Sequence, residues 1–123
     1  MDASLKFYVD NLGFIMTNKW TPRGKIEWCW LRRDDVSLML QEWKDKEKFD
    51  REGPKGRGVS ICFQCADAIV LYREFILRGV DVLEPFVGNN MWVVGLDDPD
   101  GYHLNFESAT DAPEGMKYSD WFK

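Results

Sequence analysis

The amino-acid sequence predicts an α+β protein built from two related halves. Each half reads as a helix followed by three strands, and only the second half has a strand before its helix. The helix-ending glycines Gly13 and Gly79 lie 66 residues apart, as do Leu38 and Leu104 in the last strand of each half. A repeat of this kind predicts two supersecondary units that pack side by side. The first unit lacks the opening strand that the second one has.

The stretch 96–107 carries the clearest local signal. Asp98-Pro99-Asp100-Gly101 predicts a tight turn, because proline fixes φ near about −65° and glycine can adopt a positive φ. The strand that follows alternates, with apolar residues on one face (Tyr102, Leu104 and Phe106) and polar residues on the other (His103, Asn105 and Glu107). This pattern predicts a wall between a core and either a polar cavity or solvent.

Capping residues and periodicity predict the remaining elements. We expect a helix over 4–12 with Ser4 as its N-cap, and a second helix capped by Asp67 and ended by Gly79. Strands are expected at 14–20, 26–31, 36–42, 58–65, 80–83 and 91–96, with a loop at 85–90. After Ser108 the chain turns polar and carries three aromatic anchors, Tyr118, Trp121 and Phe122, which are expected to pack on the surface.

Composition limits the classes of function. A net charge of −5 argues against nucleic-acid binding, which needs a basic surface. No apolar run approaches the ~20 residues that span a bilayer, and no signal-peptide segment is visible at the N-terminus. Three cysteines cannot all pair with one another, which favours a reducing environment. We therefore expect a cytoplasmic location, with no membrane and no nucleic-acid partner.

Two motifs resemble a known family. Residues 4–14 (SLKFYVDNLGF) look like the helix motif S-x-x-F-Y-x-x-x-L-G-F of the vicinal oxygen chelate superfamily, and residues 98–102 (DPDGY) look like its turn. This superfamily includes glyoxalase I, bleomycin-resistance proteins, fosfomycin-resistance enzymes and extradiol dioxygenases. The resemblance covers residues 2–108 and implies paired βαβββ modules within one domain of residues 1–123. Module one is 1–42, the linker 43–57, module two 58–108 and the tail 109–123.

The resemblance also bears on metal binding. In the family's enzymes four inward side chains hold a divalent metal, and three of those positions match Met39, Ser60 and Asn105 here. The fourth position would lie on the strand that the first module lacks. A thioether, a hydroxyl and an amide make a poor site for Zn, Mg, Mn or Fe. We expect no metal and no cofactor, as in the bleomycin-resistance branch, with a displaced site around Gln41 and Glu107 as the alternative.

The family register assigns residues to the two faces of the sheets. The concave, ligand-binding face is expected to hold Glu27, Cys29, Met39, Gln41, Ser60, Cys62, Gln64, Val93, Gly95, His103, Asn105 and Glu107. The core under the helices is expected to hold Trp28, Trp30, Leu38, Leu40, Leu71, Phe75, Leu104 and Phe106. Trp20 and Trp43, at strand ends, could rim the cavity and stack on a flat ligand.

The single histidine and a pair of cysteines are the candidates for chemical reactivity. His103 is the only histidine and could act as a general base oriented by Glu107, although a structural hydrogen-bonding role is the more ordinary interpretation. Cys62 and Cys65 have the spacing of a redox or zinc pair. Residues three apart on a strand point to opposite faces, however, which argues against such a pair.

The leading functional hypothesis is a metal-free protein that binds a small amphiphilic or cationic molecule, for example a drug of the bleomycin type. The alternatives are a lyase-, isomerase- or dioxygenase-like enzyme, with a displaced metal site or His103 acid/base chemistry, and a module of a larger assembly. Cavity modules in this family often come from different subunits, so we expect a homodimer. Its interface is expected to involve Trp20, Trp43, Phe86 or the tail 118–122. The first module lacks its opening strand, so one edge of its sheet is expected to be unpaired. A second subunit would cover this edge; the alternatives are that the tail folds over it or that residues upstream of Met1 supply the strand.

Overall fold

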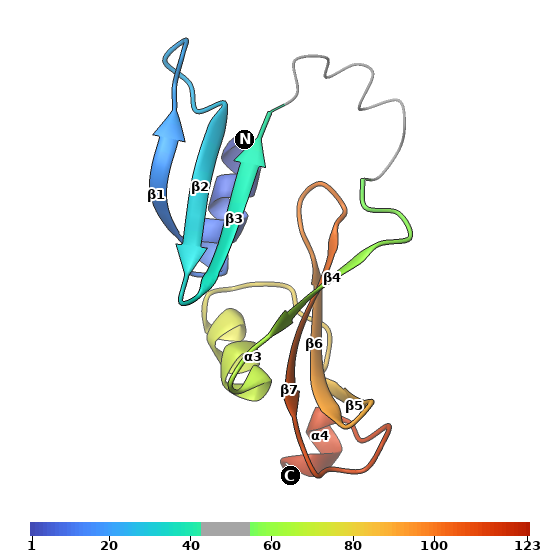
Figure 1. Cartoon of the computed structure of the whole chain (residues 1–123). Helices are drawn as coiled ribbons and strands as arrows, with labels where there is room; N and C mark the ends of the chain where they lie inside the picture. The colour runs from blue at the N-terminus through green and yellow to red at the C-terminus, as the bar shows by residue number, and fades with distance from the viewer. Residues whose placement is uncertain (43–54) are drawn as a thin grey trace. The chain divides into compact units, whose positions relative to one another are not determined.

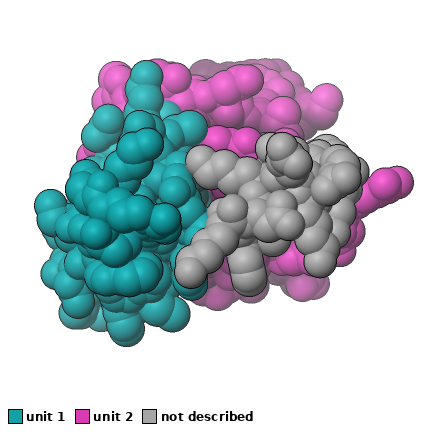
Figure 2. Space-filling view, turned by 90° about the horizontal axis from the view of Figure 1, so that it is seen from above, with its two compact units in different colours: residues 1–55 teal, residues 56–123 magenta. Residues whose placement is uncertain are grey.

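The computed structural model describes residues 1–42 and 55–123, so the predicted site residue Trp43 lies outside the described residues. The chain forms two compact units, residues 1–55 and 56–123, which Figure 2 colours teal and magenta. No helix in the described part of the chain is long and apolar enough to cross a membrane.

Unit 1 packs a short helical segment on an antiparallel sheet (Figure 1). The sheet has the order β1-β2-β3, with β1 at Ile15–Trp20, β2 at Trp28–Arg33 and β3 at Val36–Gln41. The Arg33 side chain donates to the carbonyl oxygen of Leu12, which places the end of the helix on the face of β2 that carries Leu31 and Arg33. Leu31 is fully buried on that face.

The helical segment of unit 1 starts earlier than predicted. It runs as α1 (Asp2–Leu5) and continues as the wider π-helical η1 (Lys6–Asn11), where Leu12 N–H bonds to the carbonyl of Phe7, five residues back. The prediction of Ser4 as N-cap was wrong, because the Met1 ammonium is held by Glu42 Oε1 at 2.9 Å and the chain is helical from Asp2. Gly13, at φ 79°, ends the segment as predicted.

Unit 2 repeats this arrangement with one strand more (Figure 1). Its elements are β4 (Ser60–Gln64), α3 (Ala68–Leu77), β5 (Phe86–Gly88), β6 (Met91–Asp97), β7 (His103–Ala109) and the tail helix α4 (Tyr118–Trp121). The sheet order is β4-β7-β6-β5, with β4 parallel to β7 and the other pairs antiparallel. The predicted α+β class is confirmed. Within the described residues, unit 1 has three strands and unit 2 has four.

The ends of α3 follow the sequence signals, whereas the next strand does not. Asp67 caps α3 by accepting from the N–H groups of Ile69 and Val70. The strand predicted at 80–83 was wrong: the ladder lies at Phe86–Gly88, inside the predicted loop. The missed signal is Asn89-Asn90, whose φ angles of 53° and 61° close a two-residue hairpin of the kind that requires two left-handed residues.

The core of unit 2 lies between α3 and the sheet. Phe106 contacts Phe75 of α3 edge-to-face at 5.3 Å and stacks on Phe63 of β4 at 5.0 Å. Phe75, Leu104 and Phe106 are buried as predicted. Two of the three predicted anchors of the tail pack on unit 2: the ring centroids of Tyr118 and Tyr72 lie 4.9 Å apart, and those of Phe122 and Trp92 lie 5.8 Å apart. Trp121, the third, is 48% exposed.

Candidate ligand-binding site

Each sheet has one face toward a helix and one open face, and in unit 2 the open face is polar. Cross-strand partners share a face, and β4 and β7 pair Ser60 with His103, Cys62 with Asn105 and Gln64 with Glu107. The register of β6 adds Asp97 opposite His103, Gly95 opposite Asn105 and Val93 opposite Glu107. The polar face, as we call these residues, is built as the alternation of the sequence predicted. Its part in binding stays a prediction.

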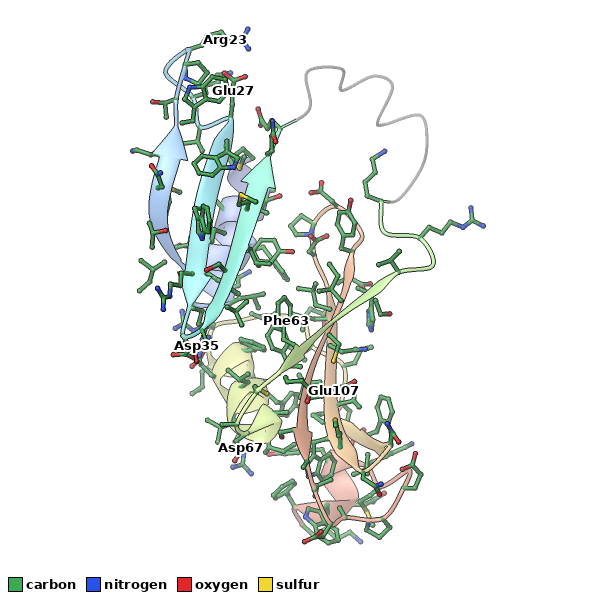
Figure 3. The ribbon with its side chains drawn as sticks, viewed as in Figure 1. Arg23, Glu27, Asp35, Phe63, Asp67 and Glu107 are labelled. Carbon is green, nitrogen blue, oxygen red and sulfur yellow. The ribbon has the colours of Figure 1, made fainter. Side chains whose placement is uncertain are left out.

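In unit 1 the predicted faces of β2 were reversed. Cys29 pairs with Leu40 and Leu31 with Leu38, and both Cys29 and Leu31 are fully buried on the helix side. Trp28 pairs with Gln41 and Trp30 with Met39, on the open side. Trp28 and Trp30 are therefore not core residues, and Cys29 does not line the open face. Glu27 precedes β2, and its carboxylate forms an ion pair with Arg23 at 2.9 Å (Figure 3).

The reversal has a simple geometric cause. Met39 and its counterpart Asn105 are 66 residues apart, but their partners Trp30 and Gly95 are only 65 apart. The β2–β3 hairpin has two residues beyond its last pair, whereas the β6–β7 hairpin has five. This odd difference breaks the uniform 66-residue offset. A one-residue error in register moves every side chain of a strand to the opposite face.

The open face of unit 1 is rich in exposed aromatic and apolar surface. Trp20 pairs with Trp28 across β1 and β2, and the Trp28 and Trp30 rings lie edge-to-face with centroids 6.3 Å apart. The exposed fraction is 54% for Trp20, 40% for Trp30 and 62% for Met39. We call Trp20, Trp28, Trp30, Met39 and Gln41 the aromatic face. Large apolar side chains exposed together on a sheet mark an interaction site.

On the polar face, Gln64 links two neighbours. Its Nε2 donates to Glu107 Oε2 at 3.4 Å and contacts Cys62 Sγ at 3.5 Å. Cys62 is exposed, but partial desolvation of its thiol, together with the hydrogen bond and negative charge of Glu107, raises the pKa of this thiol. The thiol therefore stays protonated at neutral pH, which disfavours a nucleophilic or metal-ligating role.

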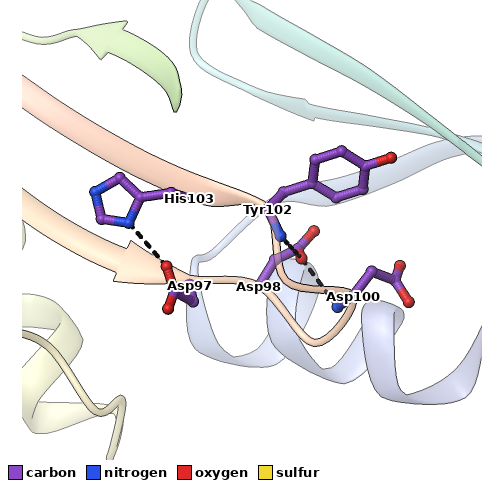
Figure 4. A network of polar contacts seen from close by, with 5 residues as sticks. All are labelled: Asp97, Asp98, Asp100, Tyr102 and His103. Atoms are coloured by element: carbon purple, nitrogen blue, oxygen red, sulfur yellow. Dashed lines mark hydrogen bonds and ion pairs between the residues drawn. The ribbon is translucent and has the colours of Figure 1, made fainter. Parts of the chain in front are cut away.

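The partner of His103 differs from the predicted one. Its Nδ1 lies 2.8 Å from Asp97 Oδ1 (Figure 4), whereas the carboxylate of Glu107 contacts Gln64. Asp97 faces His103 directly across the β6–β7 pair. The alternation of residues along β7 shows only that Glu107 shares a face with His103, so the sequence pattern could not identify Asp97 as the partner. The adjoining turn is held by Asp98, whose Oδ1 accepts from the N–H groups of Asp100 and Tyr102.

The residues present do not fit a divalent metal. Of the three positions that match the family's ligands, Met39 belongs to unit 1, and Ser60 and Asn105 belong to unit 2. Their thioether, hydroxyl and amide groups are weak ligands for hard or borderline cations. In the part of the chain that the structure describes, no three His, Cys, Asp or Glu side chains come together to hold an ion. Gln41 lies on the aromatic face and Glu107 on the polar face, so a displaced site has no support within either unit.

The chain matches a protein-family model over most of its length. The model described as "Glyoxalase/Bleomycin resistance protein/Dioxygenase superfamily" matches residues 1–106. The chain belongs to this superfamily. The membership agrees with the resemblance of the helix and turn motifs. A comparison with curated proteins found no match.

Solved structures of the superfamily share the fold of this chain. A bleomycin-binding protein complexed with bleomycin is 21% identical, with coverage of 89% of this chain and 90% of that one and a TM-score of 0.66. A bleomycin resistance determinant encoded on the transposon Tn5 is 22% identical over 88% of both chains, with a TM-score of 0.67. TnmS3, an antibiotic binding protein from Streptomyces sp. CB03234, is 20% identical, with coverage of 89% and 86% and a TM-score of 0.67. At these identities the likeness establishes the fold alone.

Proposed function

We propose that this superfamily member binds a small, flat, amphiphilic or cationic molecule without a metal and thereby sequesters it. The observation that carries the proposal is the aromatic face, where Trp20 and Trp30 are about half-exposed on adjacent strands. Indole rings bind flat aromatic groups by stacking and attract cations through their π electrons. The polar face carries the carboxylates of Asp97 and Glu107 and no lysine or arginine, which favours a cationic guest.

The similar structures support this choice. One of them is a bleomycin-binding protein with bleomycin bound, and another is an antibiotic binding protein. Their sequence identity to this chain is too low, and a shared fold too general, to infer the same ligands here. The proposal therefore depends on the chemistry of the open faces. Apolar contact area is the main requirement of a ligand site, and the aromatic face supplies it within unit 1.

Fluorescence titration tests the proposal with two probes, metal-free bleomycin and the flat aromatic cation proflavine. We expect saturable quenching of tryptophan fluorescence by at least one probe, and an affinity loss of about tenfold or more for Trp30→Ala, the order of magnitude of one lost aromatic anchor. Trp121→Ala removes a tryptophan of similar exposure (48%) from α4 and is the matched control. Failure of both probes to bind the wild-type protein would contradict the proposal, as would equal losses for the two variants.

Metal analysis tests the second part of the proposal. The purified protein, dialysed against a chelator, is expected to hold no stoichiometric divalent metal, because Met39, Ser60 and Asn105 are weak ligands. Elemental analysis by mass spectrometry is the measurement. Metal retained at one equivalent per chain would favour the enzyme alternative.

We also propose a cytoplasmic homodimer. In unit 2, β4 lies along β7, whereas β3, the counterpart of β7, has no such neighbour within the described residues. Exposed strand edges are usually covered, and a second copy would cover this one. Trp20, Phe86 and the tail 118–122 are the expected interface residues. Light scattering is the test: a monomer of 14.4 kDa that persists over about a tenfold range of dilution would exclude the dimer.

A further inference from the structure

We infer that His103 and Asn105 form a two-point hydrogen-bonding subsite for a primary carboxamide on the bound molecule. The inference rests on the proposed binding function and adds the chemical group that the polar face recognises. Three observations carry it: the fixed orientation of the imidazole, the convergence of both side chains over Gly95, and the charge of the surrounding residues.

The Asp97 carboxylate fixes the imidazole ring of His103. A carboxylate can only accept hydrogen bonds, so the 2.8 Å contact between His103 Nδ1 and Asp97 Oδ1 places the proton of the neutral ring on Nδ1. The lone pair is then on Nε2. Within the described residues Nε2 makes no hydrogen bond of its own, and the ring is about one-third exposed. Nε2 is therefore an oriented acceptor that is available to a ligand.

The side chains of His103 and Asn105 converge over Gly95. This glycine faces Asn105 across the β6–β7 pair. A Cβ atom at Gly95 would lie 3.3 Å from Asn105 Oδ1, 3.3 Å from His103 Cε1 and 3.5 Å from His103 Nε2. The two contacts at 3.3 Å are tight, so a Cβ at position 95 requires the Asn105 amide or the His103 ring to shift by a few tenths of an ångström. A Cβ at Gly95 would meet the amide oxygen of Asn105, but this amide makes no hydrogen bond to another described residue. It is therefore free to turn about its terminal bond and present its N–H₂ group beside His103 Nε2 as a donor.

A primary carboxamide is the group that matches this pair. Its N–H₂ can donate to His103 Nε2, while its carbonyl oxygen accepts from the Asn105 amide. A carboxylate lacks the donor and would be repelled by the nearby carboxylates of Asp97 and Glu107. A ketone or ester also lacks the donor. A tertiary amide keeps the carbonyl but has lost both N–H groups, so it provides the closest negative comparison.

The test uses benzamide and N,N-dimethylbenzamide as probes with NMR readout. His103 is the only histidine, so its ring nitrogen signals are assigned without ambiguity. Benzamide is expected to shift the His103 Nε2 signal and the Asn105 side-chain N–H₂ signals saturably. N,N-dimethylbenzamide and benzoate are expected to leave both unchanged. Gly95→Ala keeps every polar group and should weaken benzamide binding several-fold, while Asn105→Leu should abolish the shift of Nε2.

The outcomes separate this inference from the proposed function. Equal shifts from benzamide and its dimethyl analogue would show that only the phenyl ring binds, and would overturn the inference. The absence of any shift with benzamide, in wild-type protein that still binds proflavine, would also overturn it and leave the proposed function standing. Retention of the His103 Nδ1–H tautomer in Asn105→Leu shows that this variant keeps its fold.

Discussion

The open faces of the two sheets differ in chemistry although the sheets share one plan. In unit 1 the position opposite Met39 is Trp30, and in unit 2 the equivalent position opposite Asn105 is Gly95. Unit 1 thus presents large aromatic side chains, and unit 2 presents small residues beside hydrogen-bonding groups. In both units the buried residues toward the helix are apolar, Cys29 and Leu31 in unit 1 and Leu104 and Phe106 in unit 2. The shared plan determines which positions are exposed in each sheet. The residues at these positions give unit 1 an apolar open face and unit 2 a hydrogen-bonding one.

The helix of unit 2 and the helical segment of unit 1 also differ, in how their first turns are capped. α3 has a side-chain cap, since Asp67 accepts from two backbone N–H groups. The helical segment of unit 1 has no side-chain cap at its start and widens into π geometry after its first turn. We expect α3 to depend on its cap, and the first segment to depend more on the burial of Phe7, Tyr8 and Leu12.

The largest expected effect is on the core of unit 2. Phe106→Ala should lower the free energy of unfolding by about 3–5 kcal/mol, because it leaves a cavity between Phe75 and Phe63. Asn105→Ala, on the open face of the same strand, is the control and should cost about 1 kcal/mol or less. Urea unfolding followed by circular dichroism measures both. A cost below about 1 kcal/mol for Phe106→Ala would mean that the faces of β7 are reversed.

The next effect tests the corrected register of unit 1. Leu31→Ala should cost about 2–5 kcal/mol, because Leu31 is fully buried on the helix side. Trp30→Ala removes a larger side chain from the open face and should cost about 1 kcal/mol or less. If Trp30→Ala proved the more destabilising change, Trp30 would belong to the core after all.

A smaller effect distinguishes the two helices. Asp67→Ala should cost about 0.5–2 kcal/mol, because the N–H groups of Ile69 and Val70 lose their acceptor. Asp2→Ala, in the first turn of α1, removes no capping bond and should cost less. Thermal melts of the two variants, compared with the wild type, provide the measurement. Equal costs would contradict the difference in capping.

The smallest effect concerns the thiol of the polar face. Partial desolvation and the neighbouring Glu107 raise the pKa of Cys62, so less thiolate is present at pH 8 and alkylation by iodoacetamide should be slow. Glu107→Gln should accelerate alkylation several-fold. Gln64→Leu should slow it, because the Gln64 hydrogen bond lowers this pKa. Peptide mass spectrometry measures the rate at Cys62, and a change of the same sign in both variants would refute the assignment.

Much of unit 2 follows from its sequence, because the signals there are local. The Asp98–Gly101 turn fixes where β7 begins, and strict alternation then assigns Leu104 and Phe106 to the core and His103 and Asn105 to the open face. The Asp67 cap and Gly79 likewise bound α3. Each of these features depends on residues that are near one another in the chain, which is why sequence patterns are sufficient to predict them.

Unit 1 was harder to predict, because β2 carries apolar residues on both faces. Trp28 and Trp30 alternate with Cys29 and Leu31, so hydrophobicity cannot tell the core side from the open side. The prediction of the core side of β2 assumed a uniform 66-residue offset between the two halves. The hairpin loops of the two units differ in length, so this offset does not hold. The contact of His103 with Asp97 could not be predicted, because it depends on the register between β6 and β7. The aromatic face could not be predicted either, because it depends on the pairing of β1 with β2.

The hydrogen bonds of the turn before β7 also slow the isomerisation of aspartate. An Asp-Gly sequence such as Asp100-Gly101 forms a succinimide when the glycine nitrogen attacks the aspartate side chain, and then yields isoaspartate. Here Gly101 N–H donates to the carbonyl of Asp98 at 3.0 Å, and Asp100 N–H is held by Asp98 Oδ1 at 2.9 Å. The peptide groups on both sides of Asp100 are therefore restrained, and attack requires the hairpin to open. Isoaspartate at this position would accumulate during storage in proportion to the time that the hairpin spends open.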